Sequence, residues 1–272
     1  MKRSGKGVLN HMADWNDNRT RQGFGVSPDQ AGDISSRSAT TFDAGLRKHM
    51  LSIYNYMASG VLLTGIVALL TAQSGLAVSL MQGPMMWVVA LSPLAIVFAM
   101  SFGRNKFSTG TLQAMFWGFA VLMGLSLSTI FLAYTASSIA ATFFATAGAF
   151  AGLSLFGYTT QKDISGWGAF LIMGVVGLII ASLLNAFLIG SPGLELAISA
   201  IGVLIFAGLT AYDTQRLKQE YMTIQHLKVT NPGVAEAFPI GKLVILGALN
   251  LYLDFINMFL FLLRFMGVAR GE

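Results

Sequence analysis

The chain of 272 residues contains no cysteine and few charged side chains. The absence of cysteine excludes disulfides, thiolate metal sites and cysteine nucleophiles. Asp, Glu, Lys and Arg together make up 11 % of the residues, whereas a soluble domain carries about 25 %. So few charges cannot cover a water-facing surface. A water-soluble enzyme or a nucleic-acid-binding protein is therefore not expected, although the net charge is +5.

Long apolar runs are abundant, and hydrophobic residues make up 54 % of the chain. Crossing the hydrocarbon core of a bilayer takes about 20 apolar residues in a helix. Such runs are too evenly apolar for the strands of a β-barrel, which would alternate in polarity. The sequence therefore predicts an all-α polytopic membrane protein, a bundle of seven transmembrane helices. The predicted spans are Leu51–Thr71, Pro84–Phe102, Leu112–Ala133, Ser138–Tyr158, Trp167–Ile189, Leu194–Asp213 and Gly241–Phe265.

The positions of Lys and Arg predict the orientation of the bundle, because cytoplasmic loops are enriched in these residues. With the N-terminus in the cytoplasm, all 17 Lys and Arg except Arg264 and Arg270 fall on the cytoplasmic side. Seven crossings then place the C-terminus outside. Those two arginines would also be cytoplasmic if the last apolar stretch re-entered instead of crossing. Seven crossings are the favoured interpretation.

The polar segments outside the spans complete the predicted organisation. Residues 1–45 contain no apolar run and are rich in Ser, Gly, Asn, Asp and Arg. We expect a disordered cytoplasmic tail there, with a docking segment for a partner as the alternative. The transmembrane domain is expected over residues 46–268. Within it, residues 214–240 are predicted to form a cytoplasmic loop between helices six and seven.

Asp254 is an ionisable residue well inside the last predicted span. Such a group costs several kcal/mol at bilayer depth unless it is paired or hydrated. Asn250 and Asn257 stand four residues before it and three after it, so all three share one helix face. Lipid cannot satisfy these groups, and the face must point to the bundle interior or to a wet cavity. Interhelical hydrogen bonding explains asparagines well, but it explains an aspartate poorly.

Asp213 stands at the end of the sixth predicted span and permits two interpretations. It is either a solvated residue paired with Arg216 or a partner for Asp254 on the neighbouring antiparallel helix. Two nearby carboxylates in a low-dielectric site cannot both ionise easily, so they would share a proton and titrate as a unit. They would also offer hard oxygen ligands to Ca²⁺. Since Ca²⁺ prefers six to eight oxygens, the pair predicts a transit site without tight binding.

Two segments resemble the transmembrane Bax inhibitor motif family, in its bacterial branch. They are Ala-Tyr-Asp-Thr-Gln-Arg at 211–216 and Leu-Asn-Leu-Tyr-Leu-Asp-Phe-Ile-Asn at 249–257. The segments Ser-Phe-Gly-Arg at 101–104 and Gly-Leu-Ser-Leu-Ser at 124–128 look similar too. The likeness covers about residues 45–268.

The resemblance implies a seven-helix bundle whose last helix is surrounded by the others. It also implies that Asp213 and Asp254 act as the pH sensor of a calcium leak, with a basic residue of helix two as a latch. Arg104 is the candidate latch, although it follows the apolar run. The long segment 214–240 is a departure, because the family has a short link there.

Two functions of different class follow. The first is a pH-sensitive cation leak for calcium in the bacterial inner membrane. In this function Asp213 and Asp254 sense protons and contact the metal ion. The supporting polar residues are Asn250, Asn257, Arg104 and Arg216. The second is a non-conducting interaction protein that modulates a membrane protease or a stress response. Neither is an enzyme, and no tightly bound cofactor is expected. An aspartyl protease would need Gly-x-Gly-Asp at Asp254, and a retinal protein would need a lysine in the last span.

Overall fold

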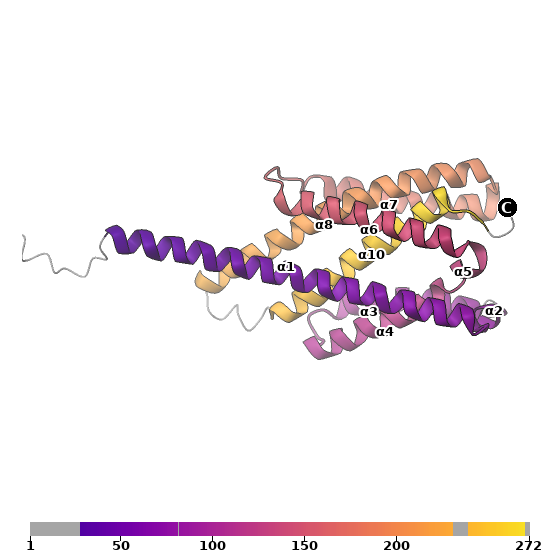
Figure 1. The fold of residues 1–272 in the computed structure, drawn as a ribbon, viewed down its shortest axis with the longest axis horizontal. Helices are drawn as coiled ribbons and strands as arrows, with labels where there is room; N and C mark the ends of the chain where they lie inside the picture. Colours follow the sequence, from indigo (N-terminus) through magenta and orange to yellow (C-terminus); the bar gives the residue numbers. More distant parts are fainter. Residues whose placement is uncertain (1–27, 81, 231–238, 270–272) are drawn as a thin grey trace, which may run out of the picture. The chain divides into compact units, whose positions relative to one another are not determined.

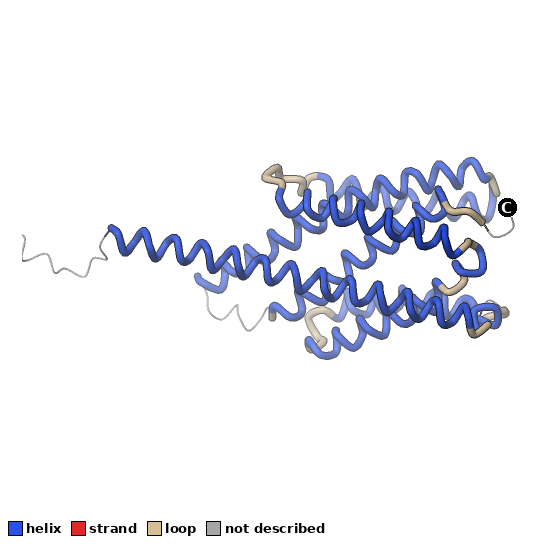
Figure 2. The backbone as a smooth tube through the Cα atoms, in the orientation of Figure 1, coloured by secondary structure: helices blue, strands red, loops and turns tan. Residues whose placement is uncertain are grey.

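The computed structural model describes the backbone of residues 28–80, 82–230 and 239–269, and side chains from residue 44 onward. The chain divides into two units, Met1–Gly45 and Leu46–Glu272, and the second unit contains the bundle. Its described part is helical, and an isolated bridge between Tyr134 and Ala269 is the extended pairing found there (Figure 2). The elements are α1 Pro28–Gln73, α2 Leu76–Leu80, α3 Met85–Gly103, α4 Thr109–Leu127, α5 Ile130–Ala133, α6 Ala136–Thr159, α7 Trp167–Leu184, η1 Asn185–Ile189, α8 Pro192–Thr230 and α10 Ile240–Met266 (Figure 1).

The all-α prediction with seven spans is confirmed. Seven helical segments are long and apolar enough to cross a membrane. Each overlaps one predicted span: the fifth coincides with it, the second is shifted by one residue, the sixth is much longer, and the other four extend beyond it at one or both ends. The segments are Ala44–Gln73, Met85–Gly103, Thr109–Ala133, Ala136–Thr159, Trp167–Ile189, Pro192–Thr230 and Ile240–Met266.

The outward faces of the helices carry large apolar side chains, as a lipid-facing surface requires. Phe102 is 84 % exposed, and Phe170 and Leu204 are each at least 70 % exposed. A soluble monomer rarely exposes such side chains in continuous patches. Their exposure on helices of spanning length confirms the membrane class.

Two of the spans change their geometry near one end. The third span breaks between α4 and α5, where the Ser128 hydroxyl donates to the Leu125 carbonyl at 2.7 Å. The fifth span ends in the π-helical turn η1, and Gly190 follows it with a φ of +64°. Asn185 fixes that turn, because its side chain donates to the Ser191 carbonyl and accepts from the Ser191 N–H. Polar side chains thus satisfy the backbone groups that these irregular turns leave open.

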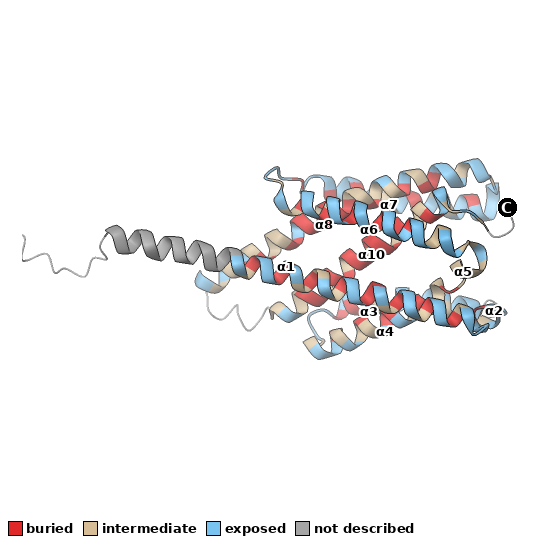
Figure 3. Cartoon of the chain, in the orientation of Figure 1, coloured by how far each residue is buried: buried red, intermediate tan, exposed pale blue. Residues whose placement is uncertain are grey.

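Helix α10 forms the centre of the bundle. Within its most apolar stretch 67 % of the residues are buried, against 39 % or less in every other span. The difference is visible in Figure 3, where α10 has few exposed positions. Tyr252 lies at its middle, packed edge-on against Phe116 and Phe119 of α4. The hydroxyls of Tyr252 and Thr64 lie 2.7 Å apart, and Thr64 donates to the Ala120 carbonyl. The last helix is therefore surrounded by the others, as expected. It is also unbroken over 27 residues, or about 40 Å, which is the length of a crossing rather than of a re-entrant hairpin.

The expected disordered tail is corrected in part. Residues 1–27 lie outside the described residues, but α1 begins at Pro28, so residues 28–45 are helical. Proline is favoured at the first position of a helix, where its missing N–H costs no hydrogen bond. A polar composition with no apolar run does not prevent a helix when the segment continues directly into a membrane span.

Candidate functional site

The sixth helix does not end at Asp213. It continues to Thr230, so the predicted loop over 214–240 is wrong for residues 214–230, and residues 231–238 lie outside the described residues. Leu217, Tyr221 and Ile224 are buried at helical spacing, and the Tyr221 ring stacks on His49 of α1 with centroids 4.5 Å apart. This apolar stripe keeps the segment helical, although its other faces are charged. Asp213 is consequently an interior residue of α8.

Three consecutive residues of α8 point to three different neighbours. Successive side chains on a helix are rotated by about 100°, and Asp213, Thr214 and Gln215 are all buried. Asp213 interacts electrostatically with Asp254 of α10. Thr214 faces Tyr54 of α1, and its hydroxyl is buried without a hydrogen-bond partner among the described residues. The polar side chains of the Asp-Thr-Gln segment therefore face three different elements.

Gln215 joins α8 to the segment between α6 and α7. Its carbonyl oxygen accepts from the Ile164 N–H at 3.0 Å, and its amide donates to the Lys162 carbonyl at 2.8 Å. Within that segment the Asp163 carboxylate accepts hydrogen bonds from the hydroxyl and the backbone N–H of Ser165, which lower the pKa of Asp163 below its ordinary value. Asp163 therefore stays ionised at neutral pH and belongs to the turn.

Glycine brings α6 into contact with α8 beside Asp213. A Cβ placed on Gly157 would collide with the Ala211 carbonyl oxygen and would lie 3.0 Å from the carbonyl carbon. The obstacle is backbone, so no side-chain movement could relieve it. The backbone of α6 therefore packs directly on the turn of α8 that contains Asp213.

Asp213 is buried and has a cationic partner. The residue is 8 % exposed. Its Oδ1 lies 3.4 Å from Nη1 of Arg216, one turn further along α8. The Arg216 side chain is 43 % exposed, against 12 % for that of Asp213. The expected pairing of these two residues is present, but the carboxylate end lies in the core rather than in solvent.

Asp254 lies deeper than Asp213, at 5 % exposure. Its Oδ2 has no hydrogen-bond partner within the part of the chain that the structure describes. It interacts electrostatically with the Asp213 carboxylate and with the Arg216 guanidinium. A carboxylate in this position is poorly compensated, because a buried polar atom normally finds a partner.

The packing of α8 on α10 brings the two carboxylates to within about one helical turn of each other along the helix axes. A Cβ on Gly247 of α10 would lie 2.9 Å from the Leu217 side chain of α8, which fixes the register of these antiparallel helices. Asp213 precedes Leu217 by one turn and Asp254 follows Gly247 by two turns, so their offset along the helices is about 5 Å.

A cavity of about 490 Å³ gathers three of the predicted supporting residues. Arg104, at the end of α3, lines it together with Arg216 and Asn250. The same cavity is lined by Glu220 and Gly247. Arg216 forms the ion pair with Asp213, while Arg104 faces the same cavity. Neither aspartate lines this cavity. Arg216 links it to the carboxylate pair through its ion pair with Asp213, whereas Arg104 and Asn250 are placed at the cavity and not at the carboxylates.

Asn257 is not part of this group. Its amide donates to the Leu253 carbonyl of its own helix at 2.9 Å. It lines a different cavity, together with residues of α3, α4 and α7 such as Pro93, Phe119 and Leu178. The helical spacing placed the three polar residues on one broad face, but the bundle packs different helices against its two ends.

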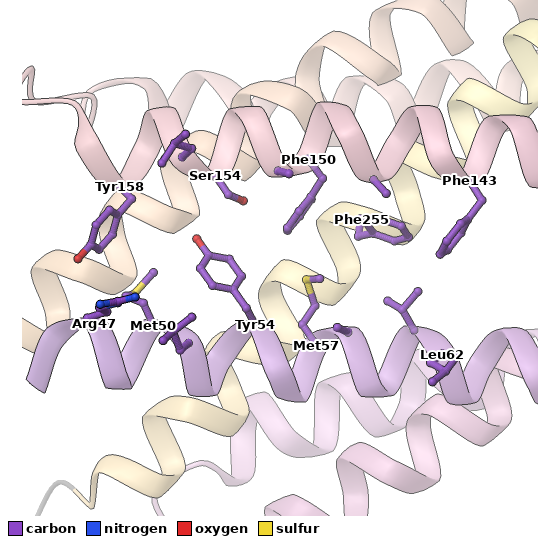
Figure 4. A pocket seen from close by; sticks show the side chains of 16 residues that line it. Arg47, Met50, Tyr54, Met57, Leu62, Phe143, Phe150, Ser154, Tyr158 and Phe255 are labelled. Atoms are coloured by element: carbon purple, nitrogen blue, oxygen red, sulfur yellow. The ribbon is translucent and has the colours of Figure 1, made fainter. Parts of the chain in front are cut away.

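Sequence reasoning missed Tyr54, Ser154 and Gln215. Tyr54 of α1 faces Thr214 of α8 and Ser154 of α6, and Figure 4 shows Tyr54 pointing across to Ser154. The hydroxyls of Thr214 and Ser154 are buried without a hydrogen-bond partner among the described residues. Single hydroxyls and amides are common in spans, so only the contacts between distant helices identify these residues. No group of three or more His, Cys, Asp or Glu side chains that could hold a metal occurs among the described residues.

Comparison with known proteins identifies the family. The family model described as inhibitor of apoptosis-promoting Bax1 matches residues 46–271. An uncharacterized protein of Caulobacter vibrioides is 45 % identical over 87 % of this chain and 94 % of its own length. The inner membrane protein YbhL of Escherichia coli is 44 % identical over 84 % of this chain and 94 % of its own length. A Borreliella burgdorferi relative is 39 % identical over 83 % of this chain and 94 % of its own length.

Proposed function

The chain belongs to the Bax-inhibitor family of membrane proteins, and on that premise we propose that it is a pH-sensitive cation leak for calcium. Asp213 and Asp254 are the proton sensor and the ion-contacting groups. The observation that supports the proposal is that two carboxylates are buried in the core of the bundle and interact electrostatically, and that one of them lacks a hydrogen-bond partner among the described residues. Interhelical adhesion would need only amides, whereas two ionisable groups offer a response to protons.

The mechanism rests on competition for the carboxylates. Two negative charges in a low-dielectric core repel each other, and a shared proton relieves the repulsion. The Arg216 guanidinium offers an alternative partner for Asp213. When the proton leaves, the pair presents oxygen ligands of the kind that Ca²⁺ prefers. While the proton is shared, the carboxylates hold α8 and α10 together. When the proton is released, the same carboxylates would form a transient cation site.

The cavity that contains Arg104, Arg216 and Asn250 is the entry to the pair in this proposal. Asn250 supplies an amide oxygen one turn before Asp254. Arg104 acts as the latch that competes with cations for the carboxylates. Positive charge at the entry slows cations, which suits a slow leak better than a fast channel.

The proposed location is the bacterial inner membrane, with the N-terminus in the cytoplasm. The relative from Escherichia coli supports the inner membrane by its name. The distribution of Lys and Arg supports the orientation. The cavity with Arg104 and Arg216 then opens toward the cytoplasmic side.

Calcium flux into proteoliposomes, measured from about pH 6 to about pH 8, tests the proposal. We expect a pH-dependent flux in the wild type and a flux without pH dependence in Asp213→Asn and in Asp254→Asn. Asp163→Asn is the matched control, because it makes the same change at an exposed carboxylate that stays ionised over this range. Its pH profile should match that of the wild type.

Two outcomes would contradict the leak. A flux whose pH dependence survives both substitutions would place the sensor elsewhere. An absence of flux at every pH, with correctly folded and oriented protein, would favour the non-conducting interaction protein. The part of α8 beyond the core supports that second candidate, since it presents exposed residues such as Thr223 and His226 on a rigid helix.

A further inference from the structure

A groove of about 720 Å³ lies between α1 and α6, away from the cavity of Arg104 and Arg216. One wall is α1, with Met50, Met57 and Leu62, and the other is α6, with Phe150 and Phe143 (Figure 4). Phe255 of α10 lies behind them. The volume is typical of sites that hold a small molecule, which occupy about 300–1,000 Å³.

The groove has one polar end. Arg47 of α1 and Tyr158 of α6 lie at the same end, on opposite walls, while Leu62 and Phe143 lie at the other end (Figure 4). Arg47 is exposed and has no carboxylate partner among the residues that the structure describes. The hydroxyls of Tyr54 and Ser154 lie further along the groove and carry no charge. The charged group of the groove is therefore the guanidinium at its end, which has no carboxylate partner within the described part of the chain.

The dimensions of the groove match one leaflet of a bilayer. Arg47 and Leu62 are separated by 15 residues of continuous helix, or about 22 Å. One leaflet is about 20–22 Å deep when its headgroup region is included, of which about 15 Å is hydrocarbon. Since Arg47 stands at the beginning of the first span, its guanidinium lies at headgroup level, and the apolar walls extend from there into the hydrocarbon.

We propose that the groove binds one anionic phospholipid, with an acyl chain between α1 and α6 and the headgroup phosphate on Arg47. Charge complementarity identifies this occupant, because a guanidinium pairs well with phosphate. Apolar walls alone would accept any lipid chain. An anionic lipid is selected only by the positive end, and basic residues next to spans attract anionic headgroups. The proposal does not depend on whether the protein conducts calcium.

The test is lipid retention by the full chain in neutral detergent, followed by native mass spectrometry. Phosphatidylglycerol and phosphatidylcholine with identical acyl chains are the two probes. We expect the wild type to retain one phosphatidylglycerol several-fold better than phosphatidylcholine. Arg47→Gln should abolish the preference. Lys48→Gln is the matched control, because Lys48 is also exposed but does not line the groove, and it should keep the preference.

A second pair of variants tests the acyl chain. Ala151 lines the groove, and Ala151→Trp should reduce retention of both lipids by filling it. Ala145→Trp adds the same ring to an exposed position of α6 outside the groove, and it should retain both lipids. Equal retention of the two probes by the wild type would overturn the proposal. So would equal losses in Arg47→Gln and Lys48→Gln, which are surface changes that leave the core intact.

Discussion

At the residue scale, the aspartates differ in what surrounds them. Asp213 has an arginine one turn away, whereas Asp254 is buried without a hydrogen-bond partner on Oδ2 among the described residues. Removing the charge of Asp213 frees Arg216, and removing that of Asp254 relieves the less compensated group. We therefore expect Asp254→Asn to fold at least as stably as Asp213→Asn. The melting temperatures of the two variants in detergent measure this difference, and a lower value for Asp254→Asn would contradict it.

Gly157 is the residue whose size most directly limits the position of α8. In Gly157→Ala the new Cβ would meet the Ala211 carbonyl, so α6 and α8 must separate. Forced packing of this kind costs about 1–3 kcal/mol, and we expect a lower melting temperature.

The control for Gly157→Ala is Gly152→Ala on the same helix. A Cβ on Gly152 would meet no atom within 4 Å. Alanine there should be neutral or should stabilise α6 by about 0.5–1 kcal/mol, since glycine is a poor residue inside a helix. Equal melting temperatures for the two variants would show that α6 does not pack on Ala211.

At the scale of elements, the part of α8 beyond Asp213 distinguishes the structure from the predicted loop. The chain has no cysteine, so single cysteines can be introduced without removing others. We expect slow maleimide labelling at positions 217, 221 and 224, which are buried, and fast labelling at 216, 223 and 227, which are exposed. This period of 3.6 residues is the signature of a helix with one packed face. Uniformly fast labelling at all six positions would contradict the helix and support the predicted loop.

The same helix shows how far sequence reasoning reaches. The seven spans follow from the length of the apolar runs, and Asp213 and Asp254 follow from the rarity of carboxylates in such runs. The extension to Thr230 did not follow, because its charged residues lower the hydropathy and hide the stripe of Leu217, Tyr221 and Ile224. Composition reports whether a segment suits lipid. It does not report whether a polar segment packs against a neighbour.

Sequence reasoning also could not predict the contacts between helices that are distant in the sequence. Tyr54 and Thr214 are 160 positions apart in the sequence, and neither is unusual in its own helix. Asn257 shows the reverse error, since spacing grouped it with Asp254 although its side chain bonds within α10. Periodicity assigns a residue to a face of its helix. The packing of the bundle decides which neighbour covers that face.

At the scale of the whole molecule, the distribution of basic residues predicts the orientation. An impermeant maleimide applied to intact spheroplasts should label cysteines placed at Thr135 and Ser191, which lie at helix ends on the predicted outer side. A cysteine at Lys162, between α6 and α7, should be labelled only after lysis. The reverse labelling pattern would show that the bundle has the opposite orientation in the membrane. Labelling of all three in intact spheroplasts would contradict seven crossings.

The central position of α10 has a consequence for biogenesis. The ribosome makes this helix after the other six, yet it contacts α4 as well as α6 and α8, and so joins the α3–α4 pair to the group of α6, α7 and α8. Until it is inserted, the aromatic side chains of the earlier helices that pack against α10 lack their packing partner. Completion of translation, rather than the first contacts between neighbours, is thus the event that consolidates the protein. A chain that ends before Ile240 should therefore be degraded by proteases, and should not persist as a folded protein of reduced stability.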